Sequence, residues 1–180
     1  PFDAEKRLLA IGSDVTSRYT RRNEAEYIRI RKYILSVIHA KKGNYLVFFP
    51  SYKYMQDVAE LFDEITDNVD IMMQHQNMNE EDKEKFLGRF EANENKDKSL
   101  LGFGVMGGVF SEGIDLKNDC LIGTIIVGTG LPSINTEGEL LRRYYDEKEN
   151  CGYEYAYMYP GMNKVLQAAG RVIRTVDDRG

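Results

Sequence analysis

The stretch "LLGFGVMGGVFSEGIDL", Leu100–Leu116, joins a short apolar run to a glycine-rich loop. Its first three glycines have the G-x-G-x-x-G spacing of a dinucleotide-binding turn. That turn needs a helix that opens at the third glycine and an acidic residue about 20 residues further on. Here Gly108 and Gly113 follow instead, no apolar helical stripe begins, and the later run "IIVGTG" contains no acid. The stretch therefore predicts a buried strand and a loop, not a dinucleotide site.

Two interpretations of these glycines stay open at this point. In the first, Gly102 and Gly104 allow close packing along the strand, and Gly107 with Gly108 forms a turn. In the second, Gly107 and Gly108 present backbone N–H groups to a phosphate. The rest of the chain must decide between them.

Apolar β-rich runs alternate with helical stripes along the chain. Strands are expected at Asn44–Phe49, Val69–Met73, Leu100–Met106, Leu121–Gly128 and Tyr155–Tyr159. Helices are expected at Glu24–Ala40, after Ser51, after Asn79, over Glu137–Glu149 and from about Asn163 to Arg174. This alternation predicts an α/β fold with a parallel sheet flanked by helices. Ligands of such sheets bind beyond the carboxyl ends of the strands. The loops 50–52, 106–115, 128–135 and 160–161 are therefore of most interest.

Composition limits the function classes. The chain has 180 residues, 42% of them hydrophobic, which is enough for one domain with its own core. No apolar run approaches the roughly 20 residues that span a bilayer, and no secretory signal is visible, so a cytoplasmic protein without membrane contact is expected. Cys120 and Cys151 form neither a disulfide framework nor a zinc site, and no metal site is predicted. The net charge of −5 argues against binding nucleic acid by bulk charge, but it leaves room for a local basic groove.

The segment "QAAGRVIR", Gln167–Arg174, carries the chemistry that decides the function. On a helix, Gln167, Arg171 and Arg174 would lie within about 60° of one another. Gly170 costs about 1 kcal/mol inside a helix relative to Ala, which suggests a close approach there. Guanidinium groups in such an array suit phosphate oxygens, although a solvated basic face near a helix end is the alternative. The residues expected to point to the core are Leu166, Ala169, Val172 and Ile173.

The pattern Q-x-x-G-R-x-I-R in this segment resembles motif VI of superfamily 2 helicases of the DinG/XPD type. "YLVFFPSY", Tyr45–Tyr52, is similar to motif IV, and "GGVFSEGIDL", Gly107–Leu116, is similar to motif V. "TSRYTRR", Thr16–Arg22, resembles the segment that leads into the second motor domain, and "VGTGLPSIN", Val127–Asn135, resembles the loop after motif V. The motifs follow one another in the family's order and cover nearly the whole chain.

The resemblance implies a RecA-like, P-loop NTPase-like fold and the second motor domain of an ATP-dependent DNA helicase. Residues 1–180 would form one domain, with a lead-in segment 1–43 and the motifs in 44–180. The chain has neither G-x-x-x-x-G-K-[ST] nor a D-E-x-H-like motif and opens without Met, so a fragment of a larger protein is expected. ATP and Mg²⁺ would be bound mainly by a first helicase domain, where any iron–sulfur cluster would also lie. The expected partners are that N-terminal domain and single-stranded DNA.

The resemblance also assigns residues to roles. Arg171 and Arg174 match the arginines that reach the γ-phosphate, and either could be the arginine finger. The residues expected near the nucleotide are Gln167, Gly170, Gly113 and Asp115. Those expected near DNA are Ser51, Tyr52, Gly107 and Gly108.

Each DNA-side residue also has a structural interpretation. Ser51 either donates to a DNA phosphate or caps a helix, and Tyr52 either stacks on a base or is a boundary aromatic. Gly107 and Gly108 stand where many relatives place a Thr, so a contact there requires backbone N–H groups. Glu112 replaces the Arg of RNA-type relatives, which favours the DinG/XPD branch.

Other residues give weaker indications. The arginines at 18, 21 and 22 either line the DNA path or form a solvated cluster, and Tyr144 and Tyr145 are similarly ambiguous. Gln74, at a strand end, is a weak DNA-side candidate. The alternative function for the whole chain is a stand-alone, non-catalytic module that binds nucleotide or nucleic acid. A phosphate-binding motif encoded upstream of Pro1 would favour the helicase.

Overall fold

The computed structural model of the chain describes residues 4–62, 68–92, 97–110, 114, 116, 120–173 and 178–180. The helices are α1 Glu24–Ala40, α2 Tyr52–Ala59, α3 Glu80–Ala92, α4 Thr136–Glu149 and α5 Tyr159–Ala169. The strands are β1 Asn44–Phe49, β2 Val69–Met73, β3 Ser99–Val105 and β4 Gly123–Ile126. Short 3₁₀ turns occupy Ala4–Lys6, Tyr19–Arg21 and Glu60–Phe62, and a π-helical turn occupies Glu154–Met158.

The four strands form one parallel sheet in the order β2-β3-β1-β4, which confirms the predicted α/β fold. β1 lies between β3 and β4, and all six of its residues are buried. This burial on both faces explains why "NYLVFF" is a nearly continuous apolar run without polar alternation.

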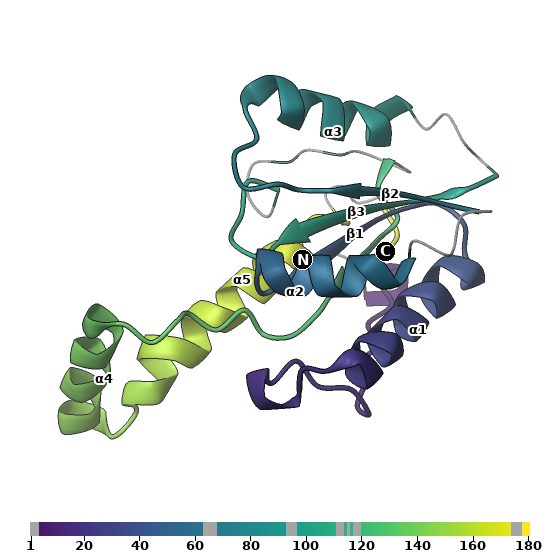
Figure 1. Ribbon diagram of the computed structural model, residues 1–180. Helices are drawn as coiled ribbons and strands as arrows, with labels where there is room; N and C mark the ends of the chain where they lie inside the picture. The colour runs from purple at the N-terminus through teal and green to yellow at the C-terminus, as the bar shows by residue number, and fades with distance from the viewer. Residues whose placement is uncertain are drawn as a thin grey trace.

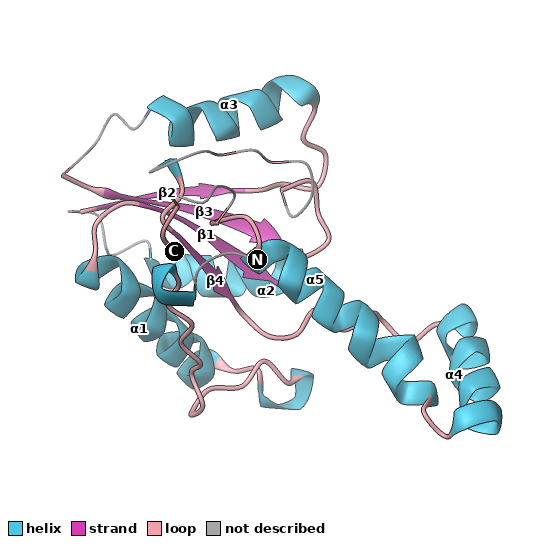
Figure 2. Ribbon diagram, turned by 180° about the vertical axis from the view of Figure 1, so that it is seen from behind, coloured by secondary structure: helices cyan, strands magenta, loops and turns pink. Residues whose placement is uncertain are grey.

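Two helical layers cover the sheet (Figures 1 and 2). Helices α1 and α2 lie on one face and α3 on the other. The odd positions of β1, Tyr45, Val47 and Phe49, join a core cluster with α1 and α2. The even positions, Leu46 and Phe48, join a second cluster with α3 and the end of α5. The period of two along β1 thus divides its side chains between the two layers.

Four helices begin where a polar side chain accepts a hydrogen bond from the amide three residues on. The pairs are Asn23 with Glu26 at 3.0 Å, Ser51 with Tyr54 at 3.3 Å, Asn79 with Asp82 at 2.8 Å and Asn135 with Gly138 at 2.7 Å. At α3 the Asp82 side chain also accepts from the Asn79 amide at 3.2 Å, so the cap is reciprocal. These local bonds set the starts of the helices that the sequence predicts.

The predicted fifth strand, Tyr155–Tyr159, is wrong. Residues Glu154–Met158 form a π-helical turn that continues into α5. The tyrosines pack on α4: the Tyr145 and Tyr155 rings stack with centroids 4.1 Å apart, and the Tyr157 hydroxyl donates to Glu139 at 2.7 Å. Hydrogen bonds from Arg142 and Tyr157 lower the pKa of the Glu139 carboxyl. Packing against a helix therefore overrides the β propensity of this run.

The loop expected at Pro160 and Gly161 is likewise part of α5. Pro160 has no N–H and its ring crowds the preceding turn, and the widened π-helical turn lies immediately before it. A Cβ atom at Gly161 would lie 2.9 Å from the Thr129 carbonyl oxygen, so glycine lets the loop after β4 reach the helix. Helix α4 and the first part of α5 form an arm that projects from the sheet (Figure 1). No described helix is long and apolar enough to cross a bilayer.

The packing of Gly102 gives a direct test of the core. A Cβ atom there would lie 2.6 Å from Cζ of Phe90 and 2.9 Å from Cδ2 of Leu46. We expect Gly102→Ala to lower the free energy of unfolding by about 1–3 kcal/mol, because the fully buried Phe90 and Leu46 side chains would have to shift within a packed core. Gly88→Ala is the control: Gly88 lies on α3 with no described atom within 4 Å of such a Cβ, so a gain of up to about 1 kcal/mol is expected. Equal urea midpoints for the two variants would contradict this packing.

Candidate nucleotide and nucleic-acid interface

The ends of the four parallel strands define one edge of the sheet. Because all strands run the same way, the residues after Phe49, Met73, Val105 and Ile126 emerge at that edge (Figure 2). Residues from motifs IV and V are thereby brought together, as expected for a parallel sheet.

Ser51 and Tyr52 follow β1 at this edge, and both are partly buried. Ser51 is the N-cap of α2, as one of its two interpretations required. The cap uses the hydroxyl oxygen as acceptor, so the hydroxyl hydrogen is not consumed by it. The Tyr52 ring packs against the core cluster of α1 and α2, and its hydroxyl lies 2.8 Å from Nε2 of Gln74.

Gln74 connects three strand ends. It directly follows β2 and is only 3% exposed. Its Oε1 accepts from the Val105 amide at 3.0 Å, and its Nε2 donates to the Tyr52 hydroxyl. Its own amide donates to the Phe103 carbonyl at 2.8 Å. Sequence reasoning gave Gln74 only a weak DNA-side role, because nothing in the sequence indicates which groups a buried amide will bridge.

The structure gives a separate reason for glycine at each of several positions in Leu100–Leu116. A Cβ atom at Gly104 would lie 3.2 Å from Oε1 of Gln74, and one at Gly108 would lie 2.8 Å from its Nε2. Gly107 has φ +73°, and the Gly108 amide donates to the Val105 carbonyl at 2.9 Å. This geometry fits a type II turn with glycine at its third position. The interpretation of these glycines as packing and turn residues is therefore confirmed, and the Gly108 amide already has an acceptor within the turn.

The helix of motif VI ends earlier than predicted. α5 stops at Ala169, Gly170 is its C-cap with φ −68° and ψ 4°, and Arg171 lies in the following turn. Gln167 is exposed on the last turn of the helix, and Arg174 lies outside the described residues. The predicted helical face shared by Gln167 and Arg171 is therefore wrong, because the chain leaves the helix at Gly170.

The predicted inner face of this helix also needs correction. Leu166 is 63% exposed and Ala169 is exposed, whereas Ala168 is fully buried. Val172 and Ile173 do pack on the second core cluster, although they lie beyond the helix. The predicted helix was misplaced because Gly170 was interpreted as an interior glycine instead of a C-cap.

Motif V contacts both motif VI and the preceding part of α5. Nη1 of Arg171 donates to the carbonyl oxygen of Ile114 at 3.4 Å, which joins the two motifs directly. The side chain of Lys164, on α5, passes over the turn of motif V, and its Cε would lie 3.4 Å from a Cβ atom at Gly107. Lys164 is not among the residues predicted from the sequence, because a lone lysine on a helix carries no specific signal. Gly113 and Asp115 lie outside the described residues, so their expected positions beside motif VI stay a prediction.

A cavity of about 470 Å³ opens beside motif V. Its floor is the segment from Gly107 to Phe110 with Ile114, and its wall is the first two turns of α3. That wall carries Glu80, Lys83 and Glu84, and Lys83 pairs with Glu80. Among the described residues, no group of three His, Cys, Asp or Glu side chains is placed to hold a metal ion.

The lead-in segment packs its arginines in different ways. Arg22 is held inside the fold: its Nε donates to the Ser17 carbonyl at 3.1 Å, and its guanidinium lies 4.3 Å from the Tyr54 ring centre. Burial raises the pKa of the Tyr54 hydroxyl to about 12, although the nearby charge of Arg22 opposes the rise. Arg22 is therefore packed against Ser17 and Tyr54, and it does not belong to a solvated cluster.

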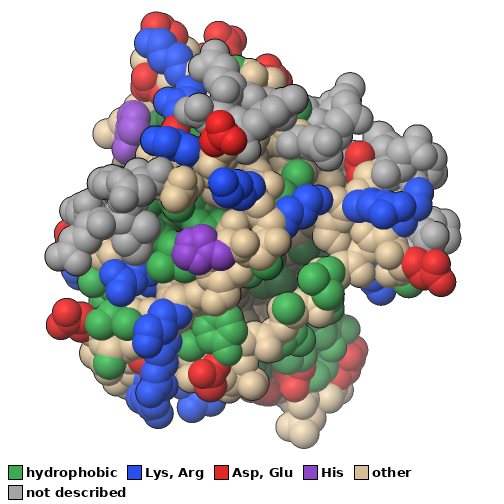
Figure 3. Space-filling model, turned by 90° about the vertical axis from the view of Figure 1, so that its right-hand side faces the viewer, with side chains coloured by type: hydrophobic (Ala, Val, Ile, Leu, Met, Phe, Trp, Pro, Cys, Tyr) green, Lys and Arg blue, Asp and Glu red, His purple; other side chains and the backbone are tan. Residues whose placement is uncertain are grey.

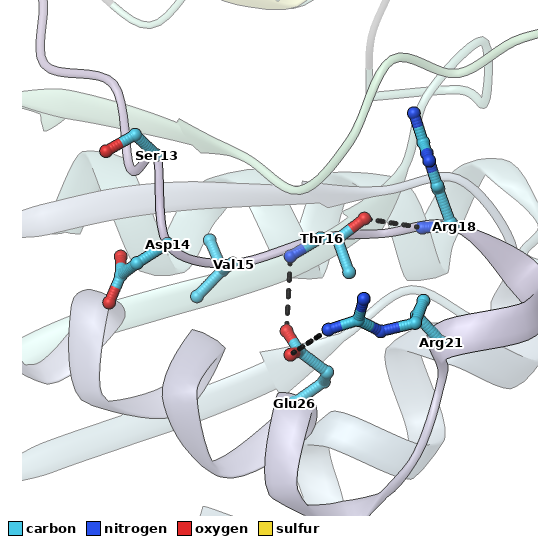
Figure 4. A pocket seen from close by; sticks show the side chains of 7 residues that line it. All are labelled: Ser13, Asp14, Val15, Thr16, Arg18, Arg21 and Glu26. Atoms are coloured by element: carbon cyan, nitrogen blue, oxygen red, sulfur yellow. Dashed lines mark hydrogen bonds and ion pairs between the residues drawn. The ribbon is translucent and has the colours of Figure 1, made fainter.

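Arg21 and Arg18 border a pocket of about 310 Å³ (Figure 4). Nη2 of Arg21 lies 3.9 Å from Oε1 of the buried Glu26, whose Oε2 accepts from the Thr16 amide at 3.1 Å. Arg18 points away from Glu26 in Figure 4 and is exposed. Arg18 is therefore the arginine of this cluster whose position best suits contact with an external anion.

On the face seen in Figure 3, the basic and acidic side chains of the described residues are interspersed. The arm likewise mixes charges: Arg142 pairs with Glu139 and Asp146. Lys148 lies 4.4 Å from the Tyr144 ring centre, and Tyr145 stacks on Tyr155. The two tyrosines are thus engaged within the arm, which favours packing over DNA contact for them.

The chain is similar to known helicases. The family model described as helicase C-terminal domain matches residues 34–180. The ATP-dependent DNA helicase XPD of Sulfolobus acidocaldarius is 30% identical over 94% of this chain and 29% of its own length. The 3'-5' exonuclease DinG of Staphylococcus saprophyticus is 28% identical over 94% of this chain and 18% of its own length. A solved structure titled XPD helicase superposes with a TM-score of 0.70 at 27% identity, over 93% of this chain and 29% of that chain.

The chain therefore spans less than a third of the length of these relatives. Its parallel sheet with helices on both faces and its XPD-like neighbours identify a RecA-like α/β fold. Because the family model covers most of the sequence and relatives of both types align along nearly all of it, the chain belongs to the family of helicase C-terminal domains of the DinG/XPD type.

Proposed function

We propose that the chain works as the second motor domain of an ATP-dependent DNA helicase. In this role it supplies arginine to ATP at the cleft between two motor domains, and it forms half of the groove for single-stranded DNA. The position of Arg171 carries the proposal. Its guanidinium lies beyond the end of α5 and against the backbone of motif V at Ile114, so this motif VI side chain links the two motifs expected near the nucleotide.

The chemistry of a guanidinium fits this role. It keeps its charge at any physiological pH and offers planar donors that match phosphate oxygens. Negative charge spreads over the oxygens of the transferred phosphoryl group, and a fixed cation there lowers the barrier. Gln167, exposed on the last turn of α5, is the polar residue of motif VI expected near the nucleotide, and Arg174 is the second candidate finger. Gly170 ends the helix so that Arg171 can leave its axis.

Magnesium has no ligand set among the described residues. We propose that the acids that hold it, and the loop that cradles the phosphates, belong to the first motor domain. Single-stranded DNA would cross the carboxyl edge of the sheet, where Ser51, Tyr52 and the Gly107 turn lie. The ATP-dependent DNA helicase activity named for the XPD relative requires both motor domains in this view.

Replacing Arg171 tests the proposed finger. In a protein that joins this chain to its first motor domain, we expect Arg171→Lys to lower ATP turnover by roughly 10³-fold, because lysine keeps the charge but loses the planar fork. ATP binding should weaken much less. The measurement is steady-state ATPase with saturating single-stranded DNA, alongside a thermal melt. Arg174→Lys is expected to behave in the same way if it shares the phosphate contact.

Arg143→Lys is the matched control, since Arg143 is exposed on α4 and away from motif VI. Its turnover should equal that of the unsubstituted protein. Near-normal turnover in both Arg171→Lys and Arg174→Lys would mean that the basic side chains are merely solvated. A large fall in melting temperature for Arg171→Lys would instead assign the residue to stability, through its bond to Ile114.

The 180-residue chain alone is expected to hydrolyse ATP at no more than the background rate. The reason is that the chain lacks the phosphate-cradling motif and a magnesium ligand set among its described residues. The measurement is phosphate release by purified chain with and without magnesium. Robust magnesium-dependent turnover that co-purifies with the chain would refute the proposal that the phosphate-binding loop and the magnesium ligands belong to the first motor domain.

The isolated chain is also expected to bind single-stranded DNA weakly, in the micromolar range or above, without sequence preference and with sensitivity to salt. Only half of the groove is present and the net charge is −5. Fluorescence anisotropy with a labelled oligothymidine, measured at about 50 mM and about 200 mM salt, gives the dissociation constant and its dependence on salt. Tight binding to one duplex sequence would contradict the proposed role.

A further inference from the structure

The buried amide of Gln74 fixes the direction of hydrogen bonding at the carboxyl edge. We propose that Gln74 is a positioning residue that makes the Tyr52 hydroxyl a donor to a phosphodiester oxygen of single-stranded DNA. It does so while tying Tyr52 to the Val105–Gly108 turn. The inference rests on the proposed function for its ligand and on the structure for its geometry.

The direction follows from what each group can do. The Val105 N–H can only donate, so the Gln74 atom 3.0 Å from it must be the carbonyl oxygen, Oε1. The amide nitrogen, Nε2, therefore faces Tyr52 and can only donate, so the Tyr52 oxygen accepts at 2.8 Å. The hydroxyl proton of Tyr52 then points away from Gln74. A hydroxyl with this polarity, on a residue that is partly exposed, suits an acceptor such as a phosphate oxygen.

The amide is also held in place sterically. The backbone of Gly104 lies on one side of it and the backbone of Gly108 on another, at distances that leave no room for a Cβ atom at Gly108. The Gln74 main-chain amide is bonded to Phe103, which anchors the residue to β3. Tyr52 and the turn of motif V are therefore held at a fixed separation through one side chain.

Three variants of the purified chain separate the parts of this proposal. Tyr52→Phe removes the donor alone. Gln74→Met removes both polar atoms at similar length. Gln74→Glu keeps an acceptor for the Val105 amide but turns the Tyr52 hydroxyl inward, because a carboxylate can only accept. Gln56→Met, exposed on α2, and Tyr153→Phe, exposed on the arm, are the controls.

We expect Tyr52→Phe, Gln74→Met and Gln74→Glu each to weaken binding of a labelled oligothymidine by about tenfold, and the controls to leave it unchanged. Gln74→Met should add little in the Tyr52→Phe background, because both changes remove the same contact. The salt dependence of binding should keep its slope in Tyr52→Phe, since a neutral donor displaces no counterion. If Gln74 had a purely structural role, Gln74→Met would lower the melting temperature, but it would not weaken DNA binding to the same extent as Tyr52→Phe.

Hydrogen exchange at the Val105 amide gives a readout that is independent of DNA. It should accelerate in Gln74→Met and stay slow in Gln74→Glu and Tyr52→Phe. Unchanged exchange in Gln74→Met would overturn the positioning role, and full DNA affinity in Tyr52→Phe would overturn the donor role. If the unsubstituted chain binds no DNA, the proposed function at this edge fails and the donor role fails with it, while the exchange data still decide whether Gln74 holds the turn.

Discussion

The burial of β1 on both faces is the constraint on which the rest of the structure depends. Successive parallel strands can be connected only by crossovers, and here α2 connects β1 to β2 and α3 connects β2 to β3. Each crossover returns the chain to the amino edge of the sheet, so every strand ends at the opposite edge. Ser51, Gln74 and Gly107 come from three separate crossovers, yet a single amide side chain reaches all three loops. The candidate site is thus a consequence of strand direction before it is a consequence of any particular side chain.

Elements with strong local signals could be predicted from the sequence. The bounds of β1, β2 and α1 agree with the predicted ranges because an unbroken apolar run or an amphipathic stripe is flanked by a capping or breaking residue. Ser51 and Asn79 predict helix starts because their side-chain oxygens accept hydrogen bonds from backbone amides in the first turn. Such information lies within a few residues, and no tertiary contact overrides it in these elements.

The errors lie where distant contacts decide the structure. Residues Tyr155–Tyr159 have the composition of a strand, but they are helical and do not pair with the sheet. Their aromatic side chains pack against α4 instead. Gly170 is equally consistent with an interior glycine and a C-cap until the path of Arg171 toward Ile114 is known. The importance of Gln74 depends on glycines 30 and more residues away, whose missing side chains make room for its amide. Residue types at these positions were visible in the sequence, but their partners were not.

Under the proposed function, the same network accounts for nucleic-acid binding by a domain with a net charge of −5. Bulk attraction falls off slowly with distance, so it holds a polyanion without fixing its position. A hydrogen bond weakens steeply within a fraction of an ångström or a few tens of degrees, so a rigidly oriented neutral donor distinguishes one register of the backbone from the next. A motor that advances along DNA must release and regain its contacts in each cycle. For the proposed function, a few directed donors held by Gln74 and the glycine turn would serve this requirement better than a strongly basic surface, whose attraction would persist between registers.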